Sequence, residues 1–225
     1  MATIDALMMD HIGVNTYQLM ELAGFGVADA IRQRTDMRQP GSVLALAGTG
    51  GNGGDAIVAA RLLTGWGHRC TVILTRRRDG FSGIAAHQLA ALDALGIPVL
   101  EPAEVEALPP ADLIIHGLLG FSLRGNPRGE AARLIRLANA AKAPTVAVDL
   151  PSGLNADTGE VGEPCIVADQ TVTLALPKTG LMAAAQAITG SIVVADIGVP
   201  PQIYSQVGVE VDPAVFASGH LVTIR

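Results

Sequence analysis

An apolar run, Val43 to Ala47, leads directly into the segment Gly48-Thr49-Gly50-Gly51-Asn52-Gly53-Gly54-Asp55, and a helical pattern begins at Ala56. This order predicts a strand, a tight loop and a helix. Glycines permit positive φ angles and a close approach of the backbone, and the free N–H groups at the start of a helix attract negative charge. The segment therefore predicts a binding site for a phosphorylated ligand.

Two known phosphate-binding motifs do not fit this segment. No Lys followed by Ser or Thr comes after its last glycine, so it is not a Walker A loop, and its glycine spacing differs from the dinucleotide fingerprint. The simplest alternative is a glycine-rich turn that binds nothing, in which Asp55 caps the helix. Because Asn52 and Asp55 stand among the glycines, we favour the binding site.

The rest of the chain alternates β-rich runs with helical stretches. After an amphipathic helix at 15–34, strands are expected at 43–47, 71–74, 113–115, 145–148, 171–176 and 192–195, and helices at 56–66, 82–95 and 128–138, with a helical or irregular stretch at 181–188. Such alternation predicts βαβ units. We therefore expect one domain over residues 1–225, an α/β three-layer Rossmann-like sandwich with a mainly parallel central sheet. The segment from Pro200 on is expected to cover a sheet edge or contact a second subunit.

Composition excludes several classes of protein. The net charge of −6 argues against nucleic-acid binding, and no apolar run approaches the ~20 residues that cross a membrane. The residues before Arg32 contain no Lys or Arg, unlike a targeting signal, so a cytoplasmic protein is expected. Cys70 and Cys165 stand alone, which favours buried reduced thiols over a disulfide or a zinc site.

Polar residues follow three of the expected strands where each strand ends. Asn52 and Asp55 follow the first strand, His116 follows 113–115, and Asp149 follows 145–148. The carboxyl ends of parallel strands share one rim, so these residues predict an active-site crevice there. Asp149 precedes a rigid proline and Ser152, which suits a fixed acid or base; the alternative is a turn carboxylate that accepts backbone N–H bonds.

Three further features lie close to strand ends. The segment Gly120-Phe121-Ser122-Leu123-Arg124-Gly125-Asn126 is a second glycine-bounded loop, in which Arg124 can bind phosphate or an amide. Lys178 follows another apolar run and either reaches the same rim or is solvated. The cluster Arg76-Arg77-Arg78 is a solvated turn or contacts a ligand phosphate. The remaining histidines show no ligand spacing and are expected on the surface or in the core.

In this order the motifs resemble those of the NAD(P)H-hydrate epimerases, also called the YjeF amino-terminal domain. The resemblance covers nearly the whole chain, at 19–24, 50–55, 120–125, 149–154, 156–159, 171–173, 178–181 and 196–200. It implies a homodimeric isomerase that interconverts the R and S forms of hydrated NADH and NADPH and binds a potassium ion. The dehydratase domain common in bacterial relatives is not found in this sequence, so a separate dehydratase is the expected functional partner.

The resemblance also implies roles for individual residues. Substrate would be bound by Gly51, Asn52, Gly53, Gly54, Asp55, Gly120, Phe121, Ser122, Leu123, Arg124, Gly125, Asn126 and Asp149. Potassium would be bound by Asn52 and Ser152, with His116 at the position of a family aspartate. Carbon 6 of the hydrated ring carries a hydroxyl beside a ring nitrogen, so the hydroxyl can leave as water and water can return on the other face. Asp149 is then predicted to act as general acid and afterwards as base, and to stabilise the cation between these steps.

Several positions depart from the family pattern. Gly51 and His116 replace Asn and Asp, Ala56 replaces Gly, Arg124 replaces Lys, and Asn126 stands where Asp is frequent. Potassium prefers oxygen ligands, so a protonated His116 would take the place of the ion and make activity independent of potassium and pH-sensitive near neutrality. Two alternatives follow: a non-catalytic nucleotide-binding or dimerisation scaffold, or a diverged enzyme acting on another nucleotide. The retained Asn52, Asp55, Asp149 and Ser152 favour the epimerase.

Overall fold

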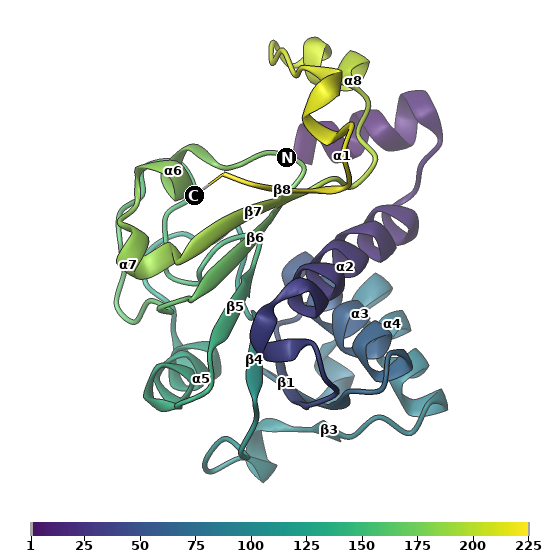
Figure 1. Cartoon of the computed structure of the whole chain (residues 1–225). Helices are drawn as coiled ribbons and strands as arrows, with labels where there is room; N and C mark the ends of the chain where they lie inside the picture. Colours follow the sequence, from purple (N-terminus) through teal and green to yellow (C-terminus); the bar gives the residue numbers. More distant parts are fainter. Residues whose placement is uncertain (1, 225) are drawn as a thin grey trace.

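The computed structural model describes residues 2–224, and its strands form one sheet in the order β3-β2-β1-β4-β5-β6-β7-β8 (Figure 1). The strands are β1 (Ser42–Ala47), β2 (Arg69–Leu74), β3 (Val99–Leu100), β4 (Leu113–Gly117), β5 (Thr145–Val148), β6 (Gln170–Leu174), β7 (Ser191–Ala195) and β8 (Leu221–Thr223). All neighbouring strands are parallel except β7 and β8. The predicted mainly parallel α/β sandwich is confirmed.

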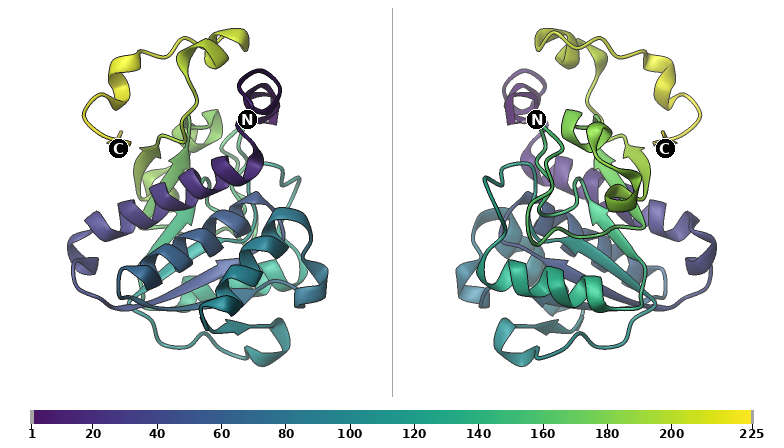
Figure 2. Two further views of the ribbon diagram at one scale, coloured as in Figure 1. Left: turned by 90° about the vertical axis from the view of Figure 1, so that its right-hand side faces the viewer. Right: turned by 90° about the vertical axis from the view of Figure 1, so that its left-hand side faces the viewer.

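Helices cover both faces of this sheet, as the two views in Figure 2 show. One face carries α2 (Thr16–Gln33), α3 (Gly51–Gly65) and α4 (Gly83–Ala94), and the other carries α5 (Gly129–Ala140), α6 (Thr179–Ala183) and α7 (Gln186–Thr189). Alternate residues of a strand face opposite sides, so Ala45 packs in the core beneath α2 and α3, whereas Leu44 and Leu46 pack in the core beneath α5. None of the helices among residues 2–224 has the length and apolar character of a bilayer-spanning segment.

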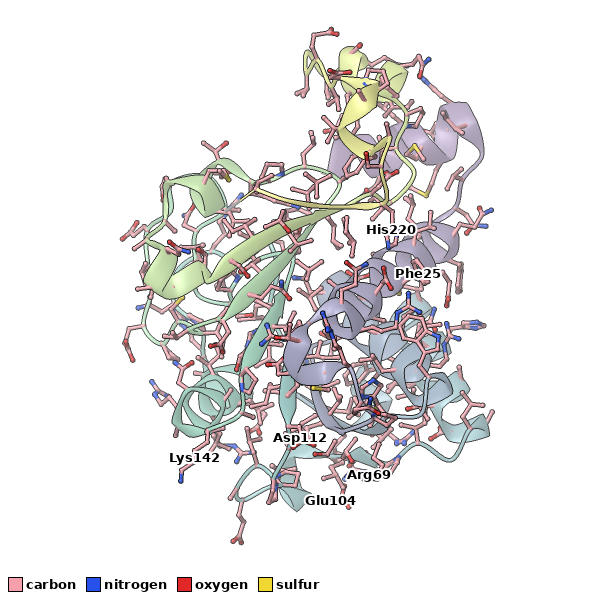
Figure 3. All side chains as sticks on the ribbon, viewed as in Figure 1. Phe25, Arg69, Glu104, Asp112, Lys142 and His220 are labelled. Atoms are coloured by element: carbon pink, nitrogen blue, oxygen red, sulfur yellow. The ribbon has the colours of Figure 1, made fainter. Side chains whose placement is uncertain are left out.

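The two ends of the chain lie near the top of Figure 1. They contain α1 (Ala2–Leu7), a short π-helical turn (Met8–Ile12), α8 (Pro201–Gln206) and a 3-10 turn (Pro213–Phe216) before β8. Strand β8 pairs with β7 at the edge of the sheet. The expectation that this segment covers a sheet edge is therefore confirmed. The ring of His220 lies 5.1 Å from that of Phe25, as labelled in Figure 3, and His220 Nε2 lies 3.1 Å from Asp29 Oδ2. These contacts tie the carboxyl-terminal segment to α2.

Helix α3 begins at Gly51, earlier than the expected start at Ala56, so most of the glycine segment is helix rather than loop. Steric crowding explains the glycines. A Cβ atom at Gly53 would lie 1.8 Å from the oxygen of Gly48, and one at Gly54 would lie 2.3 Å from Met20 Cε. Only glycine allows α3 to start this close to the end of β1 while packing against α2.

Strand β4 also extends beyond the expected range. His116 lies within it, in register with Leu46 of β1 and Ala147 of β5, and its side chain is fully buried. The expectation that His116 stands on the crevice rim is therefore wrong, because two further residues continue the hydrogen-bonded ladder past the apolar run.

Candidate active site

Two adjoining hollows open where β1, β2, β4 and β5 end. The inner pocket, of about 130 Å³, is lined by Asp5, Asn52, Asp55, Asp149 and Lys178 among apolar side chains. The outer groove, of about 720 Å³, runs along residues 49–53, 75–76, 118–122 and 128–131. Asp5, Gly51, Asn52 and Phe121 line both hollows and mark their common border. A cavity at this edge of a parallel sheet is the usual place for a ligand.

Asp149 and Lys178 form a buried ion pair in the inner pocket. Asp149 follows β5 with φ of 64°, a left-handed conformation that Asp tolerates better than most residues. Its Oδ1 accepts hydrogen bonds from Lys178 Nζ, from Leu174 N at 3.1 Å and from Thr173 Oγ1 at 3.3 Å. The side chains of Asp149 and Lys178 are only 5% and 9% exposed. Each charge stabilises the other. Lys178 therefore lies on the rim of the site, as one of its two expected positions, and is not solvated.

Asp55, in α3, lines the same pocket, and its surroundings favour the protonated form of its carboxyl group. Burial raises the pKa of Asp55 well above its usual 3.8, and the nearby charges of Asp149 and Asp5 raise it further. Burial likewise raises the pKa of Asp5 in α1. Two neighbouring carboxyl groups in different surroundings, one paired with an ammonium and one inclined to keep its proton, form a suitable acid and base pair.

Asn52 and Ser152 hold the strand ends together. Asn52 Nδ2 donates a hydrogen bond of 2.7 Å to Val148 O. The Ser152 hydroxyl donates to Leu119 O at 2.9 Å and accepts from Leu119 N at 2.8 Å. A Cβ atom at Gly120 would lie 2.3 Å from Asn52 Oδ1, so this glycine lets the second loop pass directly over Asn52. These hydrogen bonds hold Asn52 and the segments that follow β4 and β5 in place beside the inner pocket.

The predicted substrate-binding loop 120–126 divides into two parts. Gly120, Phe121 and Ser122 line the outer groove, whereas Leu123, Gly125 and Asn126 line a separate small cavity beside Gly153 and Gly162. Asn126 Oδ1 accepts a hydrogen bond from Glu163 N at 3.1 Å. Arg124 is exposed and lines neither hollow. Gly54 lines neither hollow; it packs against Met20 and so allows the close contact between α2 and α3.

His116 is neutral and unpaired. Burial lowers the pKa of His116 to about 3, and neither ring nitrogen has a hydrogen-bond partner among residues 2–224. The expectation that a protonated imidazole replaces the ion is therefore wrong, because the buried ring is uncharged at neutral pH.

The buried imidazole predicts a pH dependence of stability. Between the folded pKa of about 3 and the ordinary value of 6.5, the unfolded chain binds a proton that the folded chain does not. The free energy of unfolding therefore falls as the pH drops below that ordinary value, by about 1.4 kcal/mol per pH unit from this residue. We expect a shallower slope for His116→Leu in urea unfolding at a series of acidic pH values. The exposed His11→Leu serves as control, and equal slopes for the wild type and His116→Leu would contradict the prediction.

Two of the lining residues were not singled out by sequence. Asp5 lies in a short helix far from the strands in sequence, and Arg128 precedes α5 without a glycine-rich or otherwise distinctive context. Only the tertiary structure brings them to the rim. A carboxylate on an otherwise apolar face of the first helix was the one signal for Asp5.

Comparison with known proteins gives consistent results. A family model described as "YjeF-related protein N-terminus" matches residues 16–180. The "NAD(P)H-hydrate epimerase" of Dehalogenimonas lykanthroporepellens is 37% identical over 225 residues, which is 100% of this chain and 90% of that protein. The "Bifunctional NAD(P)H-hydrate repair enzyme Nnr" of Hyperthermus butylicus is 41% identical over 92% of this chain and 39% of its own length. The crystal structure of the yeast protein YNL200c superposes with a TM-score of 0.83 at 27% identity, covering 99% of this chain and 96% of that one.

Proposed function

This chain belongs to the YjeF-related N-terminal family, and we propose that it interconverts the R and S epimers of hydrated NADH and NADPH in the inner pocket. The observation that carries the mechanism is the buried Asp149–Lys178 pair facing Asp55. A pocket of this kind supplies a proton donor, a proton acceptor and a negative charge beside a developing cation.

The chemistry divides between the two carboxyl groups. Protonation of the hydroxyl on carbon 6 breaks the C–O bond, releases water and leaves an iminium ion between carbon 6 and the ring nitrogen. Because burial raises the pKa of Asp55, whereas Asp149 is paired with the Lys178 ammonium, we assign the proton donation to Asp55. Water then attacks the other face of carbon 6 and loses a proton to the Asp149 carboxylate. Transfer of that proton back to Asp55 through water restores the pocket, and the reverse reaction exchanges the roles.

Lys178 is a positioning residue in this scheme. Besides Asp149, its ammonium donates to Leu174 O at 3.0 Å, so two directions of hydrogen bonding fix it at the end of β6. It holds the Asp149 carboxylate in one orientation through a buried ion pair. In this scheme Lys178 would influence turnover through Asp149, without direct contact to carbon 6.

A potassium ion has no part in this mechanism, because the residues present do not fit one. The carboxylate expected from the family is replaced by a fully buried neutral imidazole, and the Ser152 hydroxyl already accepts from Leu119 N and donates to Leu119 O. Potassium is a hard cation and imidazole nitrogen is a poor ligand for it. Of the three side chains expected to bind the ion, Asn52 and Ser152 supply oxygen atoms, and neither carries a charge.

Turnover is therefore expected to be the same, within about twofold, in potassium and in sodium chloride of equal ionic strength. The measurement couples epimerisation of R-NADH-hydrate to an S-specific dehydratase in excess and follows recovery of NADH absorbance. Activation by potassium of about tenfold or more would contradict the prediction. The same assay tests the function itself, since a rate no higher than the spontaneous one, with the dehydratase shown to be active, would exclude epimerase activity.

Asp55→Asn separates the chemical role of Asp55 from its structural one. Because the fold disfavours the ionised carboxylate, a neutral amide of the same shape is expected to raise the free energy of unfolding at neutral pH. Loss of the proton donor is expected to lower kcat by about 10²-fold. Urea unfolding and the coupled assay report the two effects, with Asp112→Asn, at the other end of the sheet in Figure 3, as the control for kcat. A variant with wild-type kcat would remove Asp55 from the mechanism.

We also propose a wider setting for this reaction. A dehydratase would consume the S epimer, and the chain would act as a homodimer in the cytoplasm. The two cysteines are buried free thiols, which suits a reducing compartment.

A further inference from the structure

The outer groove carries positive charge that the reaction at carbon 6 does not use. Arg76 follows the end of β2 and Arg128 precedes α5, and both line the groove with exposed side chains. Within residues 2–224, neither forms an ion pair with another residue. Two arginines without a counter-charge at the mouth of a groove are available for an anionic ligand.

Arg76 differs in this respect from its two neighbours in the basic cluster. Arg77 Nε lies 3.7 Å from Asp79 Oδ2, and Arg78 donates to Asp93 at 2.7 Å. The stem of Arg76 instead passes close to the backbone of Gly80, where an added Cβ atom would lie 3.3 Å from Arg76 Cβ. Of the three arginines, Arg76 is the one that lines the outer groove.

The carboxylates of the groove do not cancel this charge. Glu130 is held by Arg133, and Asp5 lies at the border with the inner pocket. The mouth of the groove, between the end of β2 and the start of α5, is therefore positive although the chain as a whole carries a net charge of −6.

The position of Arg76 matches the far half of a dinucleotide. Strands β5, β4, β1 and β2 are successive neighbours, so the ends of β2 and β5, which Arg76 and Asp149 follow, are three strand spacings, about 14 Å, apart. With the hydrated ring at Asp149, the substrate passes the start of α3, where free N–H groups suit its pyrophosphate. Its second ribose then reaches the end of β2.

In dinucleotide-binding Rossmann folds, whose strand and helix order this sheet shares although its glycine spacing differs, the end of the second strand recognises the 2′ position of this ribose. A carboxylate there binds a 2′-hydroxyl, whereas an arginine accommodates a 2′-phosphate. Here β2 ends at Leu74 and continues with Thr75 and Arg76, without a carboxylate. We propose that Arg76, with Arg128 across the groove, binds the 2′-phosphate of NADPH-hydrate and makes the enzyme select it over NADH-hydrate.

This inference names the preferred substrate of the proposed function and so rests on it, but binding of stable probes tests it independently of turnover. The probes are adenosine 2′,5′-bisphosphate and 5′-AMP, titrated calorimetrically into the full chain. We expect the wild type to bind the bisphosphate about tenfold more tightly than AMP, and Arg76→Gln to lose most of this difference. Arg77→Gln changes the neighbouring exposed arginine outside the groove and is expected to keep the difference.

Equal affinities of the wild type for the two probes, or an undiminished difference in Arg76→Gln, would overturn the proposal. The coupled assay gives the matching kinetic result. The ratio of kcat/KM for NADPH-hydrate to that for NADH-hydrate is expected to fall about tenfold in Arg76→Gln, because kcat/KM for NADPH-hydrate loses more than that for NADH-hydrate. If the probes discriminate as expected while neither hydrate is epimerised, the proposed function fails and the 2′-phosphate site stands.

Discussion

Asp149→Asn is expected to lower kcat for epimerisation by about three orders of magnitude. The change removes both the proton acceptor and the negative charge beside the iminium ion. Each effect alone is worth about 10²-fold or more, and because one carboxylate supplies both, their combined loss is smaller than the product. Asn adopts the left-handed conformation of this residue as readily as Asp, so the turn after β5 keeps its φ of 64°. The loss should therefore appear in the kcat of a variant that still folds, although its stability is reduced.

The measurement is the coupled assay at saturating R-NADH-hydrate, with circular dichroism to confirm the fold. Asp157→Asn is the matched control, because this exposed residue on the loop after Asn155 changes the net charge by the same amount outside the inner pocket. Wild-type turnover in Asp149→Asn would remove Asp149 from the mechanism. An equal loss in both variants would assign the effect to net charge.

Lys178→Met is expected to destabilise the protein by about 3 kcal/mol, because it leaves a buried carboxylate without its counter-charge. The methionine stem replaces the methylene groups of lysine, so the apolar packing at the end of β6 is retained. Asp149→Asn is expected to have a cost of the same order, since it leaves a buried ammonium unpaired. The double variant is expected to be destabilised by about 1 to 3 kcal/mol less than the sum of the singles.

Urea unfolding of the wild type, the two single variants and the double variant measures this coupling. Additive costs would show that the two charges act independently in the folded chain. Turnover adds a second readout, because a positioning role for Lys178 requires a loss of kcat in Lys178→Met at temperatures where the variant is fully folded. Unchanged kcat there would limit Lys178 to stability.

The sheet and the place of the site could be predicted because they depend on local patterns. Apolar runs of three to six residues alternate with helical stretches, and such runs form parallel strands whose carboxyl ends share one rim. Asp149 was found in this way, as the first polar residue after a buried strand. The capping box of Asn15 and Gln18 likewise fixes the start of α2 near its expected position.

Other features depend on contacts that local patterns do not contain. Glycine disfavours helix, yet α3 begins inside the glycine segment because the ends of β1 and β4 and the side chain of Met20 leave no room for a Cβ atom. His116 resembles a strand-end residue in sequence but belongs to the ladder of β4. Whether Lys178 is solvated or paired depends on Asp149, which is 29 residues away.

The most direct measurement follows the oxygen on carbon 6. R-NADH-hydrate is incubated with the chain in oxygen-18 water, and the separated epimers are analysed by mass spectrometry alongside reactions with Asp149→Asn and without protein. We expect rapid appearance of the S epimer carrying one solvent oxygen in the wild type alone. Absence of conversion beyond the protein-free rate would contradict the proposed function. Rapid conversion with the original oxygen retained would contradict loss and return of water in the inner pocket.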